Sequence, residues 1–600
     1  MSPRVLTALL LLLAPPADAA PGKAEQARLD RQLAAIEAAG DRLAARSLAD
    51  YVADAAALGG DPAAIAKVLE LLRTQQELRP GHPLYGNFRW YRGQPEVLDR
   101  NAVQFVTLSS MLLAHAHPGS LGPNEPAFRR LMADAARGCA AQRVRPGYTN
   151  IFLMKATNLV LLGQYLGEPA WSEQGRSLLR EWLAHVRREG IAEYNSPTYT
   201  GVDLDCGALL RRFAREAGDR ELAEAVLRCI WTDAAANWFE PARKLGGSRS
   251  RDYDYLRGIG GPFDFQAAAA GWLEPPRPDR LGPRDGPRIW APPAAWTEPI
   301  RSQTPREVVQ RWGAGLGMQA VHWQTPSYSV GSSGAGKAFD DKVLAVTFAG
   351  NRLDPMLYLV MESQSDPYGI SKAPDSNGHG KSLHLRPLIG CAQSRDRVLI
   401  AAAEDTSRPK HLRPFPELKG LWTHLVFPSA SQLVDASGKV LAEGSALAPG
   451  SCVFVRKGAV TVGIRALVGA NGWDEAEGRR PRSAVLRRDG EQRGAARLTW
   501  EHGAGPSPGK ALVALALETA ATPDEAAFRA FATRFAAVPA EARVSGRQVE
   551  TRWGSLGATL DLAGWKTAAL TGGSTLAEGQ VMTVNGVEVL APTIDRALSR

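Results

Sequence analysis

The sequence predicts an α+β protein with more than one domain, in which helical hairpins come first and antiparallel strands follow. Three observations support this prediction. The chain has 600 residues, which is too many for one ordinary core. Its composition, 44% hydrophobic and 22% charged, is that of a globular protein. The spacing of apolar residues changes near Gly317 from a helical to a strand-like pattern.

Residues 1–19 have the features of a secretory signal peptide. Arg4 precedes an apolar run from Val5 to Ala14, and Ala17-Asp18-Ala19 is a small-x-small cleavage site. The run is short for a membrane span, and no later stretch is long and apolar enough to be one. We therefore expect an exported protein, periplasmic or secreted, that does not associate with a membrane after cleavage.

Residues 20–310 are predicted to form the helical domain. In the segment 173–188, the apolar residues Leu178, Leu179, Trp182, Leu183 and Val186 fall on one face of a helix. Further helices are expected over 24–58, 62–76, 98–115, 126–141, 150–166, 201–217 and 220–238. Helices of this length with short connections are typical of antiparallel hairpins.

Residues 311–600 are predicted to form the β domain, after a proline-rich break over 275–299. Short apolar runs there are separated by Gly, Pro, Asn and Asp, as in antiparallel sheets. The segment 307–312 is expected to add a last helical turn or two before the strands, and 525–536 a lone helix. Asn585-Gly586 predicts a tight hairpin within 581–589.

Charge and cysteine content restrict the possible partners. The net charge is +9, which suits an anionic polymer but also fits a merely arginine-rich composition. The export signal and the lack of a concentrated basic stripe argue against nucleic acid. Five cysteines do not make a disulfide framework, although a Cys391–Cys452 bridge is left open. No Cys or His spacing is that of a zinc site.

Two polar loops are predicted to meet at one active site. In the first, 193–201, Pro197 stiffens a turn that carries Glu193, Asn195 and Tyr199. Glu193 is an acid, the Asn195 amide can donate to a carboxylate, and the Tyr199 phenol can exchange a proton. The same residues would also suit an ordinary turn between two helices.

The second loop, 247–255, alternates arginines with polar residues and ends in Asp-Tyr-Asp-Tyr. Arg249 or Arg251 can bind a carboxylate, and either can lower the pKa of a nearby phenol such as Tyr253 or Tyr255. A tyrosine beside an arginine can therefore act as a base near neutral pH. The alternative is a solvated loop held by salt bridges.

Other stretches contribute candidate binding residues. Arg89 and Trp90 lie in a segment that interleaves aromatic and basic side chains, and Asn158 could face the interior of the helical domain. His379 and His384 follow a Gly-rich loop in the β domain. The segment 331–337 does not have the spacing of a phosphate-binding loop.

The order of domains and the succession Asn195, Arg249, Tyr255 resemble the toroid-plus-β-sandwich polysaccharide lyases, which include the alginate lyase, chondroitin AC lyase and heparinase II/III types. The resemblance covers most of residues 80–400. It implies an (α/α) toroid at 20–310 and an antiparallel β-sandwich at 311–600. One departure is Ser196, which stands where the alginate-lyase-like sites have a histidine.

The resemblance also implies an activity, β-elimination of a 4-linked uronate in an anionic polysaccharide, with neither metal nor cofactor. Asn195 with Arg249 or Arg251 would neutralise the carboxylate, and Tyr255 would remove the C5 proton, with Tyr253 as its rival. The same tyrosine or a second one would protonate the departing O4, and Tyr199 is the candidate for that second phenol. The candidate substrate-binding residues are Asn158, Trp90, Arg89, Glu193 and His384.

Two other functions stay open. A glycoside hydrolase would need a carboxylate pair, either Glu193 with Asp203 or Asp252 with Asp254. A non-catalytic glycan-binding protein would need neither a pair nor a base. The sequence does not indicate the glycan, endo or exo action, or the oligomeric state.

Overall fold

The computed structural model describes most of the chain, namely residues 21–253, 261–276, 281–350, 352, 356–370, 373–374, 378–381, 383–415, 417–473, 480–489 and 495–600. The expected signal peptide and two predicted site residues, Asp254 and Tyr255, lie outside the described residues. Among the described residues, no helix has the length and apolar character needed to cross a membrane.

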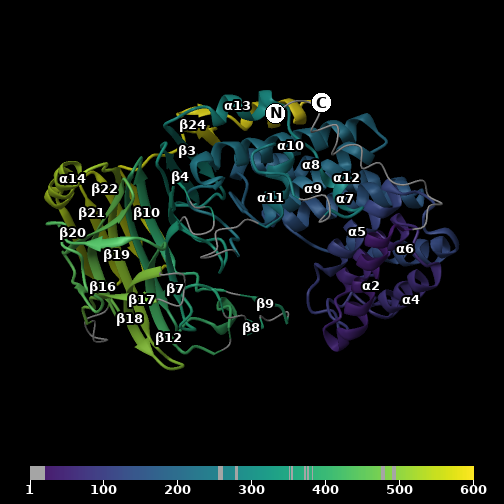
Figure 1. Cartoon of the computed structure of the whole chain (residues 1–600), viewed down its shortest axis with the longest axis horizontal. Coiled ribbons are helices and arrows are strands. Elements are labelled where there is room, and N and C mark those ends of the chain that lie inside the picture. Colours follow the sequence, from purple (N-terminus) through teal and green to yellow (C-terminus); the bar gives the residue numbers. More distant parts are fainter. Residues whose placement is uncertain are drawn as a thin grey trace.

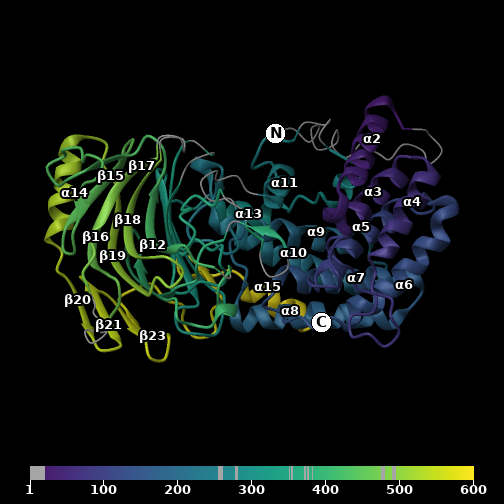
Figure 2. The ribbon, with the colours of Figure 1, turned by 90° about the horizontal axis from the view of Figure 1, so that it is seen from below.

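The helical domain is an arc of helical hairpins in two layers (Figures 1 and 2). Its main helices are α2 (Lys23–Ala38), α3 (Ala45–Ala57), α4 (Pro62–Thr74), α5 (Ala102–Ala116), α6 (Glu125–Ala141), α7 (Thr149–Leu166), α8 (Pro169–Glu189), α9 (Tyr199–Phe213) and α10 (Ala217–Asn237). Contacts between α3, α5, α7 and α9 define the inner layer, and contacts between α4, α6, α8 and α10 define the outer layer. This arrangement confirms the predicted hairpins.

Burial follows from the position of each helix in these layers. Helix α7 is enclosed by α5, α6, α8 and α9, and its residues 149–163 are all buried. Helix α8 lies outside and buries one apolar face, which includes Leu179, Trp182 and Val186. Every side chain of an inner helix must be apolar or hydrogen-bonded to another part of the protein. An outer helix needs such side chains only on the face that packs against the inner layer.

Three shorter helices connect the helical hairpins to the β domain: α11 (Pro262–Ala269), α12 (Asp285–Arg288) and α13 (Ala294–Arg301). Helix α11 packs against α9 at Gly201, where a Cβ atom would come within 2.2 Å of the Pro262 backbone. Glycine is needed at this contact because only its bare backbone admits the neighbouring chain. The close packing fixes the first turn of α9, which carries Tyr199.

The β domain is a sandwich of antiparallel sheets (Figure 1). Across the described residues the largest sheet has eleven strands, in the order β14 (Ala446–Leu447), β17 (Ala484–Asp489), β18 (Ala495–Ala504), β12 (Gly420–Phe427), β7 (Met356–Glu362), β6 (Leu344–Phe348), β5 (Tyr328–Ser333), β4 (Gln319–Gln324), β3 (Arg306–Arg311), β24 (Met582–Val584) and β25 (Val587–Glu588). The predicted hairpin at Asn585-Gly586 joins β24 to β25, and both turn residues have positive φ.

A second sheet faces the first across an apolar core. Its six described strands are β10 (Leu388–Ser394), β11 (Arg397–Asp405), β19 (Lys510–Ala521), β16 (Val460–Ala470), β15 (Cys452–Lys457) and β13 (Gln432–Val434). The core between the sheets holds Leu357, Leu425, Ile464, Trp500 and Leu515. Cys391 and Cys452 lie in this sheet and are not bonded to each other.

An outer layer completes the β domain. Strands β20 (Ala540–Ser545), β21 (Gln548–Trp553), β22 (Leu556–Asp561) and β23 (Lys566–Thr571) form a sheet that contacts β10 and β11. The predicted lone helix is α14 (Glu525–Ala537), which packs Phe528, Phe531 and Phe535 around Phe454. The chain therefore confirms the predicted fold class, α+β with a helical domain before a β domain.

Two details of the domain border differ from the expectations. The segment 307–312 is not helical, because strand β3 begins at Arg306 and pairs with both β4 and β24. Two backbone ladders offer more hydrogen bonds than one isolated helical turn. The last helix, α15 (Ala591–Leu598), leaves the β domain and lies against α8 and α10 (Figure 2).

Candidate active site

The two polar loops interlock beside α9. Asn195 has a left-handed backbone with φ of 48°, and its Nδ2 donates to the carbonyl oxygens of Gly246 and Ser248, both at 2.7 Å. The Ser250 hydroxyl donates to the carbonyl oxygen of Tyr194 at 2.8 Å. Sequence-distant loops are thus joined by buried hydrogen bonds, which makes this region stiff.

The contacts of Asn195 assign it a different task from the predicted one. Both of its amide protons are used by backbone carbonyls, and the residue is only 1% exposed. A substrate carboxylate therefore cannot receive a hydrogen bond from this amide. Asn195 instead holds the second loop in register with the first.

Replacing Asn195 should destabilise the protein. Alanine would leave the Gly246 and Ser248 carbonyl oxygens buried without their donor, and it would also strain the positive φ. We expect a loss of about 2–4 kcal/mol in the free energy of unfolding, measured by denaturant titration. Asn195→Gly also lacks the amide, but glycine tolerates this φ. Its loss of stability should therefore be about 1 kcal/mol smaller than that of the alanine variant. Equal stability of the wild type and both variants would contradict the proposed joining role.

Arg251 lies at the centre of the site. Its guanidinium donates from Nη2 to the hydroxyl of Tyr253 at 2.6 Å and to the hydroxyl of Tyr199 at 3.0 Å. The two hydroxyl oxygens are 3.3 Å apart. Nη1 donates to Glu193 Oε1 at 3.2 Å, and the rings of Tyr199 and Tyr148 flank the cation. One cation thus bridges two phenols and one carboxylate.

Glu193 is a fixed anion within this arrangement. Its Oε2 accepts from the backbone N–H of Asn150 at 2.9 Å and from Asn150 Nδ2 at 2.7 Å. Its Oε1 contacts Arg251 and, at 3.7 Å, the Nζ of Lys337. Because the carboxylate is fully buried and surrounded by donors, it orients Arg251 rather than exposing a proton-transfer group to substrate.

The β domain supplies the other side of Arg251. The Arg251 backbone N–H donates to Asp341 Oδ1 at 2.9 Å, and its Nε lies 3.5 Å from Asp340 Oδ2. Arg249 forms an antiparallel bridge with Lys342, in which each backbone N–H donates to the other residue's carbonyl. The second loop is therefore held by both domains.

Arg249 does not take the substrate-facing position that the sequence allowed for it. Its side chain is fully buried and contacts Asp252 at 3.4 Å. Arg251 is 14% exposed at its side chain. Of these two predicted arginines, the structure brings Arg251 to the tyrosines.

Burial sets the charge state of the phenols. It raises the pKa of both Tyr199 and Tyr253 above the ordinary value of a phenol, and the Arg251 guanidinium opposes the rise at both residues. Burial also raises the pKa of Asp341 to about 6 and holds that of Asp203 well above its usual range. Both phenols are therefore neutral in the resting site at neutral pH.

Three of the remaining predicted site residues, Asn158, Arg89 and Trp90, lie in the helical domain, and the fourth, His384, lies in the β domain. Asn158 is buried in α7 and donates to the backbone and side-chain oxygens of Gln104 in α5, and Arg89 donates to the carbonyl oxygens of Thr74 and Gln94. These contacts join neighbouring parts of the helical domain, and a role of either residue in binding substrate stays a prediction. Trp90 packs edge-on against Phe105 and His379.

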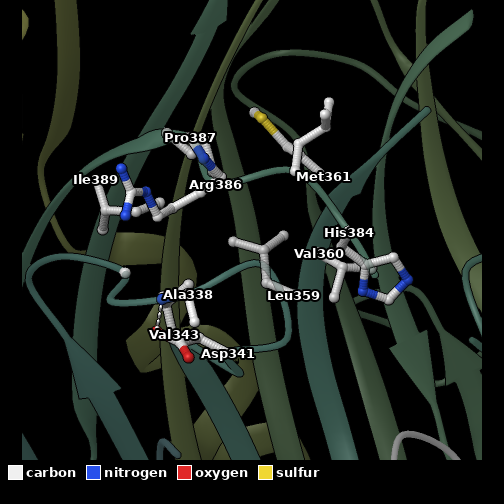
Figure 3. Close-up of a pocket in the computed structure, with 13 residues that line it drawn as sticks. Ala338, Asp341, Val343, Leu359, Val360, Met361, His384, Arg386, Pro387 and Ile389 are labelled. Carbon is white, nitrogen blue, oxygen red and sulfur yellow. Dashed lines mark hydrogen bonds between the residues drawn. The ribbon is translucent and has the colours of Figure 1, made fainter. Parts of the chain in front are cut away.

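His384 is buried inside the β domain. Its Nε2 is 3.1 Å from the carbonyl oxygen of Asp366, and burial lowers its pKa to about 3. Figure 3 shows it beside Val360 on the wall of a small cavity, whose open space of about 20 Å³ suits one water molecule. His384 is thus enclosed within the β domain, and its role in binding substrate stays a prediction.

His379 connects the two domains instead. The short strands β8 (Ala373–Pro374) and β9 (Gly380–Lys381) extend from the β domain toward the helices (Figure 1). His379 Nε2 is 2.9 Å from Asp99 Oδ2, and its Nδ1 is 3.2 Å from the Tyr91 hydroxyl. Asp99 also accepts from the backbone N–H of Asn101, whose amide donates to the Tyr148 hydroxyl. This chain of contacts leads from the domain junction to the ring beside Arg251.

Sequence reasoning missed four residues of the site: Tyr148, Lys337, Asp340 and Asp341. Tyr148 lies directly before α7, and the other three lie in the loop 334–343 that follows β5. Their local sequences carry no catalytic motif, and the segment 331–337 that contains Lys337 lacks the spacing of a phosphate-binding loop. The signal that could have found them is pairing with the second loop, which only the folded chain provides.

A family model described as a domain of unknown function, DUF8769, matches residues 55–258. No curated protein matches the sequence.

Similar solved structures include three polysaccharide lyases. A heparinase III is 10% identical, with 93% of this chain and 94% of that chain covered and a TM-score of 0.35. A Paenibacillus xanthan lyase is 10% identical, with 90% of this chain and 61% of that chain covered and a TM-score of 0.41. A chondroitin AC lyase from Streptomyces coelicolor A3, solved with chondroitin sulphate, is 12% identical. The match covers 94% of this chain and 88% of that chain, with a TM-score of 0.44.

Proposed function

We propose that the protein is a polysaccharide lyase that cleaves a uronate-containing glycan by β-elimination. One observation carries this proposal: a single guanidinium nitrogen of Arg251 donates to the hydroxyls of Tyr199 and Tyr253, which are 3.3 Å apart. Burial leaves the pKa of both phenols raised, and the Arg251 guanidinium opposes that rise, so a state with one phenolate and one phenol costs less than it would without the cation. Such a pair supplies a base and an acid within one site.

The reaction needs both partners of the pair. The phenolate takes the proton from C5 of the uronate, the electron pair forms a C4=C5 double bond, and the C4–O4 bond breaks. The second phenol gives its proton to O4 of the departing sugar. The pair ends with phenol and phenolate exchanged, and a proton passing between the two hydroxyls restores the starting state.

The carboxylate pairs that a hydrolase would use receive less support. Glu193 is tied to Asn150, Arg251 and Lys337, and Asp203 is buried with a raised pKa. Asp252 is buried beside Arg249, and Asp254 lies outside the described residues. Retaining and inverting mechanisms both need two carboxyl groups that face the same sugar. Of the three described carboxylates, Glu193 and Asp252 each contact an arginine, and Asp203 is buried.

A spectroscopic assay tests the proposal. The mature protein is incubated with alginate, glucuronan, hyaluronan, chondroitin and heparin while ultraviolet absorbance and reducing ends are followed. Elimination creates an unsaturated uronate that absorbs in the ultraviolet, so we expect both signals to rise together on at least one polymer. New reducing ends without absorbance would indicate a hydrolase, and binding without cleavage would indicate a glycan-binding protein. The expected signal peptide would deliver the enzyme to the periplasm or exterior, where such polymers occur.

A further inference from the structure

Lys337 is a cation of the β domain that reaches into the helical domain. It ends the Gly-rich segment 331–337, which begins in β5. Its Nζ donates to the carbonyl oxygen of Gly147 at 2.6 Å and lies 3.7 Å from Glu193 Oε1. The same carboxylate oxygen accepts from Arg251 at 3.2 Å. Lys337 and Arg251 are therefore neighbours on one anion.

The loop that carries Lys337 is held firmly. Asp341 Oδ2 accepts from the backbone N–H groups of Lys337, at 2.5 Å, and Ala338, at 3.0 Å, and the second of these bonds is the dashed line in Figure 3. The other oxygen of Asp341 accepts from the backbone N–H of Arg251. One carboxylate thus fixes the lysine and the arginine relative to each other.

Lys337 retains capacity to bind a ligand. An ammonium has three donors, and the contacts above use one on Gly147 and direct another toward Glu193. The side chain remains 18% exposed, slightly more than that of Arg251. Burial lowers the pKa of the Lys337 ammonium, and the Glu193 carboxylate opposes that shift. A cation with incomplete hydration and a free donor is a strong partner for an anion.

The proposed reaction still requires a group that receives the substrate carboxylate. Asn195 and Arg249 are occupied elsewhere, and Arg251 is shared by Glu193 and two phenols. When the C5 proton leaves, negative charge moves onto the carboxylate oxygens, and a fixed cation there lowers the barrier. We propose, on the basis of the lyase activity above, that Lys337 binds the uronate carboxylate of the substrate and selects the free acid over its neutral ester.

The test compares a polymer with its methyl ester. The polymer that is cleaved best in the assay above is used as the free acid and after methyl esterification of its carboxyl groups. We expect Lys337→Gln to lower kcat/KM on the free acid about 100-fold, the usual effect of removing one fixed donor to a developing anion. On the ester, which has no carboxylate to bind, the same change should matter less than about threefold. Lys337→Arg should restore most activity on the free acid.

Matched controls separate this role from a structural one. Lys566→Gln makes the same change at an exposed residue of β23, and it should leave both rates unchanged. If the wild type is active and Lys337→Gln impairs the acid and the ester equally, the assignment of Lys337 is overturned while the lyase activity stands. If the wild type cleaves none of the polymers, the lyase activity itself fails.

Discussion

Phenylalanine in place of Tyr253 or Tyr199 is expected to lower kcat about a thousandfold, because each change removes one of the two proton-transfer groups. Since the two phenols act as a unit, the double variant should be little worse than either single variant. Initial rates of ultraviolet absorbance measure the loss. Circular dichroism should be unchanged, because each variant removes only one hydroxyl.

Two further variants make this prediction specific. Tyr165→Phe removes a hydroxyl that donates to Glu125 in the outer part of the helical domain, and it should leave the rate unchanged. Tyr255→Phe tests the residue that sequence reasoning favoured as the base. Loss of activity in Tyr255→Phe, with activity retained in Tyr253→Phe, would move the catalytic role to Tyr255.

Methionine in place of Arg251 is expected to abolish turnover and to destabilise the protein. The phenols would keep the burial that raises their pKa and would lose the cation that opposes it. Any residual activity that depends on a phenolate should therefore need a higher pH than the wild type, and a pH–rate profile measures this shift. If the residual rate of the variant increased with pH over the same pH range as the wild-type rate, the role of Arg251 would be contradicted.

The stability of Arg251→Met has a separate test. The change leaves the buried Glu193 carboxylate without its closest cation, and removing one member of a buried ion pair costs about 3–5 kcal/mol. Adding Glu193→Gln should recover part of this loss, because an amide needs no counter-charge. A double variant that is less stable than Arg251→Met alone would show that Glu193 is stabilised independently of the arginine.

Much of the site followed from two short stretches. The first loop contributed Glu193 and Tyr199, and the second contributed Arg251 and Tyr253, as their residue types suggested. The assignments within the loops were less successful. Asn195 and Arg249 carry the right groups for a carboxylate, yet their hydrogen bonds join one loop to the other and to the β domain. A sequence shows which donors exist and does not show which backbone carbonyls use them.

The sequence by itself determined the succession of helical hairpins and antiparallel strands, because hydrophobic spacing is a local property of the chain. It also determined the content of the two loops. Only the tertiary structure decided that Arg251 rather than Arg249 meets the tyrosines, and that Lys337, which lies 86 positions after Arg251, meets Glu193. These choices depend on the docking of the β domain against the helices, where burial and backbone pairing decide which of several similar side chains meets the tyrosines and Glu193.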